Sequence, residues 1–471
     1  MTRVVFAAAE AAPFVKVGGL ADVAGSLPPA LARLGASVLL ILPKYGFMDP
    51  SAHGFEPSSE PLMVSFDGQA YPVRLWRGHL PNGAGQAGPP ALWIENDTFF
   101  TPCQQAYPAE HPTFSIGRYL FFSECVFAAL RHLDFRADIL HAHDWHLAPA
   151  IDRLAAKRRQ IHLFQQTGAV LTIHNLAYQG QWGDENWLAR GIRFADAVTT
   201  VSPTYAWEIQ TPEGGYGLDG LLRATPGGVR GILNGIDPAL FDPATDPHLS
   251  APYDATGFDA GKAACKRFLQ ERFDLAVDAS RPVFAMISRL VEQKGLDILL
   301  PALARLADPQ SSEYLNAQWV ILGSGEPAYE EALEAMAQRL PDLRICRGYQ
   351  AALSQQIYAG CDFFVMPSRF EPCGLSQLIA MRYGAPPVVR ATGGLADTVT
   401  DIRDEPKTGV GVRFGDYNAD ALVDALKTAA ALYPDPWRRM ALNGMARDFS
   451  WTQSARAYCD LYEELASRGE R

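Results

Sequence analysis

The chain has 471 residues, of which 48% are hydrophobic and 20% charged, and its formal net charge at pH 7 is −11. This length exceeds what one hydrophobic core usually serves, so we expect two domains. The acidic total argues against a general nucleic-acid-binding protein, because neutralising phosphates requires a basic surface. No apolar run reaches the roughly 20 residues that a membrane-spanning helix needs.

Short runs rich in β-branched residues alternate with longer helical patterns, which is typical of βαβ units and a parallel sheet. We expect strands at 3–8, 37–42, 137–141, 169–174, 197–202 and 229–233, and then at 282–288, 318–322, 343–346, 362–366 and 387–390. Residues 51–90 combine many Gly and Pro with alternating stretches such as 71–76, which suggests an inserted antiparallel excursion. The sequence therefore predicts an α/β protein of two Rossmann-like doubly wound domains facing a central cleft.

The Pro- and Asp-rich residues 237–257 look like a linker between these domains. We place the domains at 1–244 and 245–453, and expect a C-terminal helix at about 454–471 to pack back on the first domain.

The cysteines and the N-terminus indicate a cytoplasmic protein. Seven cysteines without a Cys-x-x-Cys pair suit reduced thiols. The N-terminal apolar run superficially resembles a signal peptide, but Glu10 interrupts it and the glycine turn that follows favours a first buried strand.

The pentapeptide GGLAD occurs twice, at 18–22 and 393–397, each time before a helix-compatible pattern. Adjacent glycines let backbone N–H groups approach a ligand, and a helix N-terminus favours anions, so each turn could hold phosphate oxygens. Each turn could equally be a tight strand-to-helix connection. Lys16, Arg289 and Lys294 near strand ends favour a diphosphate site, where the two later cations would stabilise a leaving pyrophosphate.

The sequence HAHDWH at 141–146 invites a metal-site interpretation, which we reject because no cysteine or HExxH pattern completes a ligand set. Asp144 beside Trp145 suits a sugar, since carboxylates bind hydroxyls and aromatic faces cover apolar sugar faces. Tyr178 and Trp182 extend this character. These side chains could instead cap and pack the loop.

Glu371 lies between a predicted strand and a helix expected at 376–383. It could accept hydrogen bonds from hydroxyls or satisfy the N-terminal amides of that helix. We interpret Cys373 as a small residue lining a pocket, because a nucleophilic cysteine needs a neighbouring His or cation.

Eight motifs resemble, in order and across nearly the whole chain, the bacterial glycogen synthases and plant starch synthases: KVGGLADV, HAHDWH, TIHNLAYQG, TPEGGYGLDG, NGID, SRLVEQKG, PSRFEPCGL and ATGGLADTV. The resemblance implies a GT-B glycosyltransferase that moves glucose from ADP-glucose to the non-reducing end of an α-1,4-glucan, either glycogen or a maltooligosaccharide. It implies retention of configuration and release of ADP. The first domain would be the acceptor side and the second would bind the nucleotide sugar.

The resemblance also implies roles for single residues. On the donor side it places contacts to phosphate and nucleotide at Lys16, Gly18, Gly19, Arg289, Lys294, Tyr349, Cys373, Gly374, Leu375, Thr392, Gly393 and Gly394. Among these, Tyr349 would be the aromatic wall of the adenine site. On the sugar and acceptor side it places Asp144, His174, Asn234 and Glu371. Glu371 would hold the glucose 3- and 4-hydroxyls and His174 the 6-hydroxyl. Many related retaining enzymes carry a second Glu where this chain has Ile379, so we assign no second carboxylate.

We expect no metal or other cofactor, because the chain has no Asp-x-Asp and lysine and arginine would take the place of Mg²⁺. The resemblance favours front-face substitution over a covalent carboxylate intermediate. Three other functions stay open: a sucrose- or trehalose-type synthase with a small acceptor, a catalytically silent glycan-binding protein, and a nucleotide-sugar epimerase.

Overall fold

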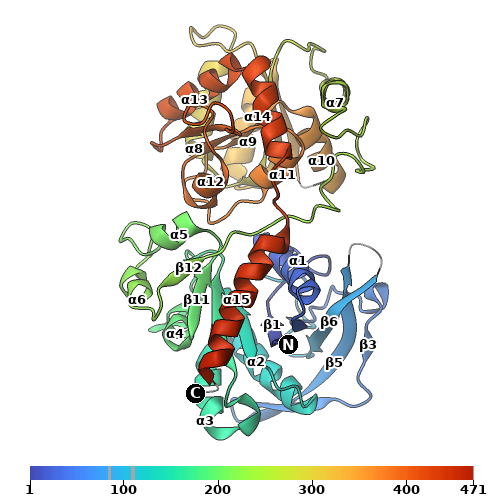
Figure 1. The fold of residues 1–471 in the computed structure, drawn as a ribbon, viewed down its shortest axis with the longest axis vertical. Coiled ribbons are helices and arrows are strands. Elements are labelled where there is room, and N and C mark those ends of the chain that lie inside the picture. Colours follow the sequence, from blue (N-terminus) through green and yellow to red (C-terminus); the bar gives the residue numbers. More distant parts are fainter. Residues whose placement is uncertain (83–85, 108–111, 349, 470–471) are drawn as a thin grey trace. The chain divides into compact units, whose positions relative to one another are not determined.

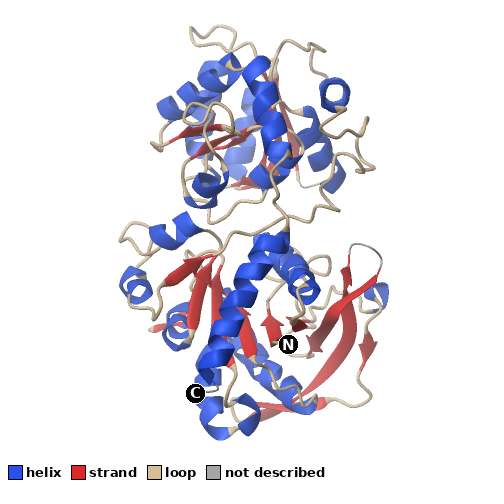
Figure 2. Cartoon of the chain, viewed as in Figure 1, coloured by secondary structure: helices blue, strands red, loops and turns tan. Residues whose placement is uncertain are grey.

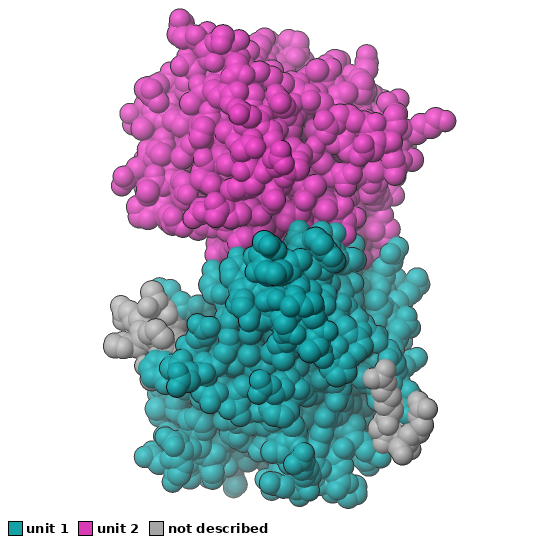
Figure 3. Space-filling view, turned by 90° about the vertical axis from the view of Figure 1, so that its left-hand side faces the viewer, with its two compact units in different colours: residues 1–235, 451–471 teal, residues 236–450 magenta. Residues whose placement is uncertain are grey.

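A computed structural model describes residues 1–82, 86–107, 112–348 and 350–469 (Figure 1). Helices and parallel strands alternate through most of the chain (Figure 2). The chain forms two compact units, which Figure 3 colours separately. Unit 1 comprises Met1–Gly235 with Trp451–Arg471, and unit 2 comprises Ile236–Ser450.

The described part of unit 1 contains a sheet of ten strands in the order β12-β11-β8-β7-β1-β2-β6-β5-β3, with β4 beside β5. Its strands are β1 (Arg3–Ala7), β2 (Ser37–Pro43), β3 (Glu56–Pro57), β4 (Leu62–Phe66), β5 (Gln69–Asn82), β6 (Gln86–Glu95), β7 (Ile139–His143), β8 (Gly168–Ile173), β11 (Ala197–Thr200) and β12 (Val229–Gly231). The strands from β12 to β6 run parallel, whereas β3, β4 and β6 pair antiparallel with β5. The expected antiparallel excursion is therefore an extension of the main sheet.

Helices surround this sheet: α1 (Gly19–Arg33), α2 (Pro112–His132), α3 (Asp144–Gln160), α4 (Trp187–Phe194), α5 (Pro203–Glu208), α6 (Asp219–Arg223) and α15 (Trp451–Gly469). The C-terminal helix α15 packs against α1 and β8. A short hairpin of β9 (Gln181–Trp182) and β10 (Glu185–Asn186) projects beyond β8.

Unit 2 has a six-stranded parallel sheet in the order β15-β14-β13-β16-β17-β18. Its strands are β13 (Val283–Leu290), β14 (Gln318–Gly325), β15 (Leu343–Arg347), β16 (Phe363–Met366), β17 (Pro387–Arg390) and β18 (Val412–Phe414). Counted from β13, this is the 3-2-1-4-5-6 order of a dinucleotide-binding fold. The helices are α7 (Phe258–Arg272), α8 (Leu296–Leu306), α9 (Pro327–Ala337), α10 (Ala351–Gly360), α11 (Ser376–Arg382), α12 (Gly393–Thr398), α13 (Ala419–Ala431) and α14 (Asp435–Met445).

The eleven predicted strands all form, and both GGLAD turns open a helix, at α1 and α12. The strand expected at 137–141 lies two residues later, because the histidines of β7 are buried like the apolar residues before them. The sequence analysis did not predict β18, which is only three residues long.

The linker interpretation of residues 237–257 was wrong, since this segment packs on unit 2. Tyr253 is 3% exposed, and its hydroxyl donates to the carbonyl of Tyr383 at 2.7 Å. Asp246 is also buried and accepts a hydrogen bond from the Tyr383 hydroxyl. Consequently the boundaries expected at 244/245 and 453/454 fall at 235/236 and 450/451. The Pro and Asp residues of this segment indicate a lack of regular secondary structure. A segment without regular structure can still be buried against a domain.

Among the described residues, no helix is long and apolar enough to cross a membrane. The seven cysteines are all free thiols.

Candidate active site

Both sheets have a point where the strand order changes direction along the chain. In unit 2 it lies between β13 and β16, and in unit 1 between β1 and β7. Ligands of doubly wound sheets bind outside the carboxyl ends of the strands at such points. The residues after these four strands are therefore the first place to look for a site.

Three segments of unit 2 lie against one another at this point: 291–295 after β13, 367–375 after β16, and 391–394, which runs from the end of β17 into α12. The Arg369 amide donates to the Gln293 carbonyl at 2.9 Å, and the Gly394 amide donates to the Glu371 carbonyl at 3.1 Å. Glycine makes this close approach possible. A Cβ on Gly295 would lie 2.1 Å from the Pro367 oxygen.

Lys294 and Glu371 form an ion pair in these loops. The Lys294 Nζ lies 2.6 Å from the Glu371 Oε2, and the Ser368 hydroxyl donates to the same oxygen at 3.0 Å. Glu371 is 5% exposed. The capping alternative for Glu371 was wrong, because no side chain caps the start of α11. The pair places a cation and a carboxylate side by side, as recognition of a sugar phosphate needs.

Arg289 is exposed at the end of β13, and among the described residues its side chain has no hydrogen-bond or ion-pair partner. A guanidinium that is not engaged within the protein is available to an anionic ligand. The other residues predicted to contact the nucleotide or its phosphates differ in exposure. Buried are Cys373, Thr392, Gly393 and Gly394, and half-buried are Gly374 and Leu375. Tyr349 lies outside the described residues.

The first glycine turn, in unit 1, is closed by a carboxylate that the sequence analysis did not recognise. Glu10 is 2% exposed and accepts hydrogen bonds from the amides of Val17 and Gly18. Burial raises the pKa of Glu10. Lys16 is exposed and pairs with Asp22 at 2.6 Å. Glu10 differs from an ordinary surface carboxylate only in being buried. The sequence contains no clear pattern that indicates this burial.

Two of the four glycine amides that we expected to face a phosphate form hydrogen bonds within the protein. The Gly18 amide donates to Glu10, and the Gly394 amide donates to the carbonyls of Glu371 and Pro372. At these two positions the glycines serve close packing of loops, because their N–H groups are already satisfied.

The HAHDWH segment forms a buried stack rather than an open ligand set. The His141 Nδ1 lies 2.7 Å from the Tyr462 hydroxyl of α15, and its Nε2 lies 2.6 Å from the Thr172 hydroxyl. His143 packs on His141 with ring centroids 4.2 Å apart. The His143 Nδ1 in turn lies 2.9 Å from the His174 Nε2. Among the described residues, no group of three His, Cys, Asp or Glu could hold a metal ion.

The contact between His143 and His174 joins two neutral rings. Burial lowers the pKa of both His143 and His174, so both imidazoles are neutral. One of the two nitrogens that meet donates the hydrogen bond and the other accepts it. Either tautomer leaves the Nδ1 of His174 to bind a ligand, as a donor or as an acceptor.

Asp144, the first residue of α3, connects the ends of two neighbouring strands. Its carboxylate accepts hydrogen bonds from the amides of His174 at 2.7 Å and Asn175 at 3.4 Å. Its backbone φ is +54°, a strained value for a residue with a side chain. Burial raises the pKa of Asp144 to about 7, although the two hydrogen bonds lower it. Asn234, also predicted for this site, is half-buried after β12.

Asp144 should make stability depend on pH. Its carboxyl holds a proton in the folded protein between pH 3.8 and about 7, where the unfolded chain has released it. The resulting stabilisation is complete below pH 3.8, falls as pH rises and is lost above about 7. In urea unfolding, the wild type should lose about 1.4 kcal/mol relative to Asp144→Asn between pH 6 and 8. Parallel curves for the two proteins would contradict this prediction.

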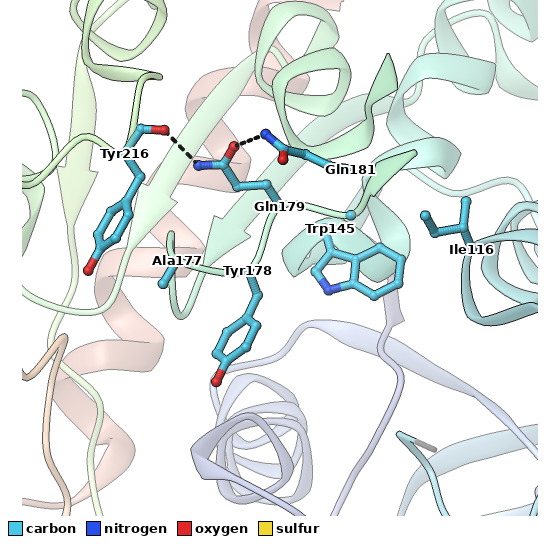
Figure 4. A pocket seen from close by; sticks show the side chains of 8 residues that line it. Ile116, Trp145, Ala177, Tyr178, Gln179, Gln181 and Tyr216 are labelled. Atoms are coloured by element: carbon cyan, nitrogen blue, oxygen red, sulfur yellow. Dashed lines mark hydrogen bonds between the residues drawn. The ribbon is translucent and has the colours of Figure 1, made fainter. Parts of the chain in front are cut away.

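Beside Asp144, unit 1 has an open pocket of about 460 Å³ lined by Ile116, Trp145, Ala177, Tyr178, Gln179, Gly180, Gln181 and Tyr216. In Figure 4 the rings of Trp145, Tyr178 and Tyr216 stand around it. Gln179 is held by the Tyr216 carbonyl at 3.1 Å. Aromatic faces with a few fixed amides are typical of sugar sites. The sequence analysis predicted Trp145 and Tyr178 for this role but missed Ile116, which belongs to a distant helix.

Comparisons with known proteins agree with this architecture. Residues 3–224 match the family model described as "Starch synthase catalytic domain", and residues 281–431 match "Glycosyl transferases group 1". The chain is similar to the solved catalytic domain of starch synthase IV from Arabidopsis thaliana bound to ADP and acarbose. That similarity has a TM-score of 0.88 and 33% identity and covers 99% of both chains. Sucrose-phosphate synthase from Thermosynechococcus elongatus shares the fold at 19% identity and a TM-score of 0.63, covering 99% of this chain and all of that one.

The fold and the loops at its strand ends thus define a GT-B glycosyltransferase. Two relatives named glycogen synthase are each 41% identical to the chain. The one from Anaeromyxobacter sp. (strain Fw109-5) matches over 99% of this chain and 100% of its own length, and the one from Moorella thermoacetica over 99% and 97%. The chain belongs to the glycogen and starch synthase family.

Proposed function

We propose that this enzyme transfers glucose from ADP-glucose to the non-reducing end of an α-1,4-glucan, with retention of configuration and release of ADP. Membership of the glycogen and starch synthase family supports the glucosyl transfer. The single observation that carries the proposal is the Lys294–Glu371 pair beside exposed Arg289, at the carboxyl ends of β13 and β16.

On the donor side, Arg289 and Lys294 stabilise the charge that develops on the diphosphate as the glucosyl bond breaks. Lys16 also contacts the phosphates of the donor, as the motif KVGGLADV suggests. Glu371 accepts hydrogen bonds from the glucose 3- and 4-hydroxyls, which its orientation by Lys294 and Ser368 supports. Residues 373–375 and 392–394 line the nucleotide sugar, and the motif position of Tyr349 suggests that it binds the adenine.

On the acceptor side, the Nδ1 of His174 forms a hydrogen bond with the glucose 6-hydroxyl, and Asn234 lines the sugar pocket. Asp144 keeps the strand ends aligned through its two amide contacts and faces the acceptor. The aromatic pocket around Trp145 and Tyr178 holds the end of the glucan.

The reaction proceeds by front-face substitution. The incoming 4-hydroxyl attacks the anomeric carbon on the side from which the diphosphate leaves, and the leaving phosphate oxygen takes its proton. The bond to the phosphate breaks as the new glycosidic bond forms. The motif position of a second carboxylate holds Ile379, which is buried in the core of unit 2.

One assay separates the proposal from its rivals. Labelled ADP-glucose or UDP-glucose is incubated with the protein, with and without glycogen, and the products are sized. We expect label in the polymer with ADP-glucose and glycogen. Label in a disaccharide would indicate a small-acceptor synthase, an epimerised nucleotide sugar an epimerase, and unchanged donor a silent glycan-binding protein.

We also propose that catalysis needs no metal, because cationic side chains take that role. Turnover should persist in excess EDTA at the rate measured with Mg²⁺. Loss of activity in EDTA that returns with Mg²⁺ would contradict this. We further propose a cytoplasmic location, which seven free thiols support because thiols persist in a reducing compartment.

A further inference from the structure

The side chain of Gln377, in the first turn of α11, is buried against the loop that precedes this helix. Its Nε2 lies 3.0 Å from the carbonyl oxygens of both Cys373 and Gly374, and 3.2 Å from the Thr398 hydroxyl oxygen. A carbonyl oxygen can only accept a hydrogen bond, so the amide nitrogen of Gln377 donates to this group of oxygens. One side chain thus connects the loop before α11 to the helix α12.

The helix α12 gives this connection a fixed end. The Thr398 hydroxyl donates to the Gly394 carbonyl, one turn earlier in α12, at 2.6 Å. Because its single hydrogen is used there, the same hydroxyl accepts from Gln377. The Thr398 carbonyl in turn accepts a hydrogen bond from the Arg447 Nη1 at 3.1 Å. Gln377 therefore holds the loop to a helix that is itself held by its neighbours.

These hydrogen bonds fix the direction of two main-chain N–H groups. In a trans peptide the carbonyl and the following N–H point in opposite directions. Since the carbonyls of Cys373 and Gly374 point to Gln377, the N–H groups of Gly374 and Leu375 point away from it. Among the described residues neither N–H has a hydrogen-bond partner. Successive N–H groups around a left-handed residue, here Gly374 with a φ of +72°, form a concavity that binds anions.

The Gln377 side chain fits closely but is not fully satisfied. A Cβ added to Gly374 would lie 2.3 Å from the Gln377 Oε1. That oxygen is buried and has no hydrogen-bond partner in the part of the chain that the structure describes. A buried acceptor without a partner lowers stability, and an apolar side chain of this size would avoid that cost. The amide is therefore better explained by what its nitrogen does for the loop than by packing.

We propose that Gln377 is a positioning residue for the donor diphosphate. It holds the N–H groups of Gly374 and Leu375 in the direction in which they bind oxygens of the diphosphate. The inference rests on the proposed function, which puts residues 373–375 along the nucleotide sugar. Because Gln377 acts through the main chain of the donor loop, it affects binding of the nucleotide and leaves binding of the glucan unchanged.

The first test is Gln377→Met, which keeps the size of the side chain but cannot donate a hydrogen bond. We expect the calorimetric Kd for ADP and the KM for ADP-glucose each to rise about tenfold, because two carbonyls lose their donor and the loop loses its orientation. The KM for glycogen, measured at saturating ADP-glucose, should equal that of the wild type.

The second test is Gln377→Glu, because its effect depends on pH. A carboxylate cannot donate to the two carbonyls and repels them, whereas a protonated carboxyl donates one hydrogen bond. The ratio of its Kd for ADP to the wild-type Kd should therefore fall at least about threefold from about pH 8 to about pH 6. The same ratio for Gln377→Met should stay constant. A side chain that only fills space would show no such difference.

Gln270→Met is the matched control. Gln270 is a second buried glutamine of unit 2, and its Nε2 donates to the Asp278 carbonyl at 3.0 Å and to the Gln318 Oε1 at 2.8 Å. This variant should lose stability but bind ADP as the wild type does. If Gln377→Met proves unfolded by circular dichroism, Thr398→Val cuts the connection at α12 instead. It should weaken ADP binding about threefold, and Thr398→Ser should restore it.

Wild-type affinity for ADP in folded Gln377→Met, or in Thr398→Val where it replaces that variant, would overturn the proposal. Equal increases in the KM for ADP-glucose and for glycogen, or a pH-independent ratio for Gln377→Glu, would overturn it as well. A wild-type protein that binds ADP but transfers no glucose to glycogen would instead contradict the proposed function. The ADP measurement would still decide the role of Gln377, so the two failures are distinguishable.

Discussion

Arg289→Ala should lower kcat by about 10²- to 10³-fold, the usual cost of removing one group that stabilises developing charge. Its thermal unfolding should match the wild type, because the side chain is exposed and has no partner among the described residues. Single-turnover kinetics together with calorimetric ADP-glucose binding would separate the chemical step from affinity.

Lys294→Ala should lose comparable activity but also stability. It leaves the carboxylate of Glu371, which is 5% exposed, without its cation, at a cost of about 3 kcal/mol. The double variant Lys294→Ala with Glu371→Gln should recover most of that stability and none of the kcat. Variants of Arg289 and Lys294 that bind ADP-glucose and turn over at the wild-type rate would refute the proposed leaving-group role.

Gly295→Ala should destabilise unit 2 by about 4 kcal/mol or more, because two separate costs coincide there. The φ of Gly295 is +80°, and its added Cβ would lie 2.1 Å from the Pro367 oxygen. The backbone of the loop after β16 must move to relieve this contact, which would displace Glu371 from Lys294. Urea unfolding and turnover of the same preparation would measure both effects.

Two matched glycines separate those costs. Gly348 has a φ of +87°, and no described atom lies within 4 Å of an added Cβ, so Gly348→Ala should cost only about 1 kcal/mol. Gly415 has neither feature in the described structure, and Gly415→Ala should be close to neutral. If Gly295→Ala resembles Gly348→Ala, the close approach to Pro367 does not constrain the site.

The sequence by itself determined the elements and where chemistry gathers along the chain. Apolar runs such as β13 and β17 predicted strands, because burial on both faces of a parallel sheet selects continuous β-branched residues. The glycine turns at α1 and α12 were evident because their backbone demands are local. Lys16, Lys294 and Glu371 were found because each follows a strand, and Arg289 because it lies at the end of one.

Only the tertiary structure decided which of these groups meet and which are already occupied. Lys294 and Glu371 are 77 residues apart and pair because β13 and β16 are neighbours, a fact of sheet order that local patterns do not encode. In the sequence, Glu10 only interrupts an apolar run. In the structure it is buried and accepts hydrogen bonds from the first glycine turn. The packing of 237–257 on unit 2 likewise arises from contacts between distant segments. Pairing and burial depend on three-dimensional proximity, and that is the reason they lay beyond the sequence patterns.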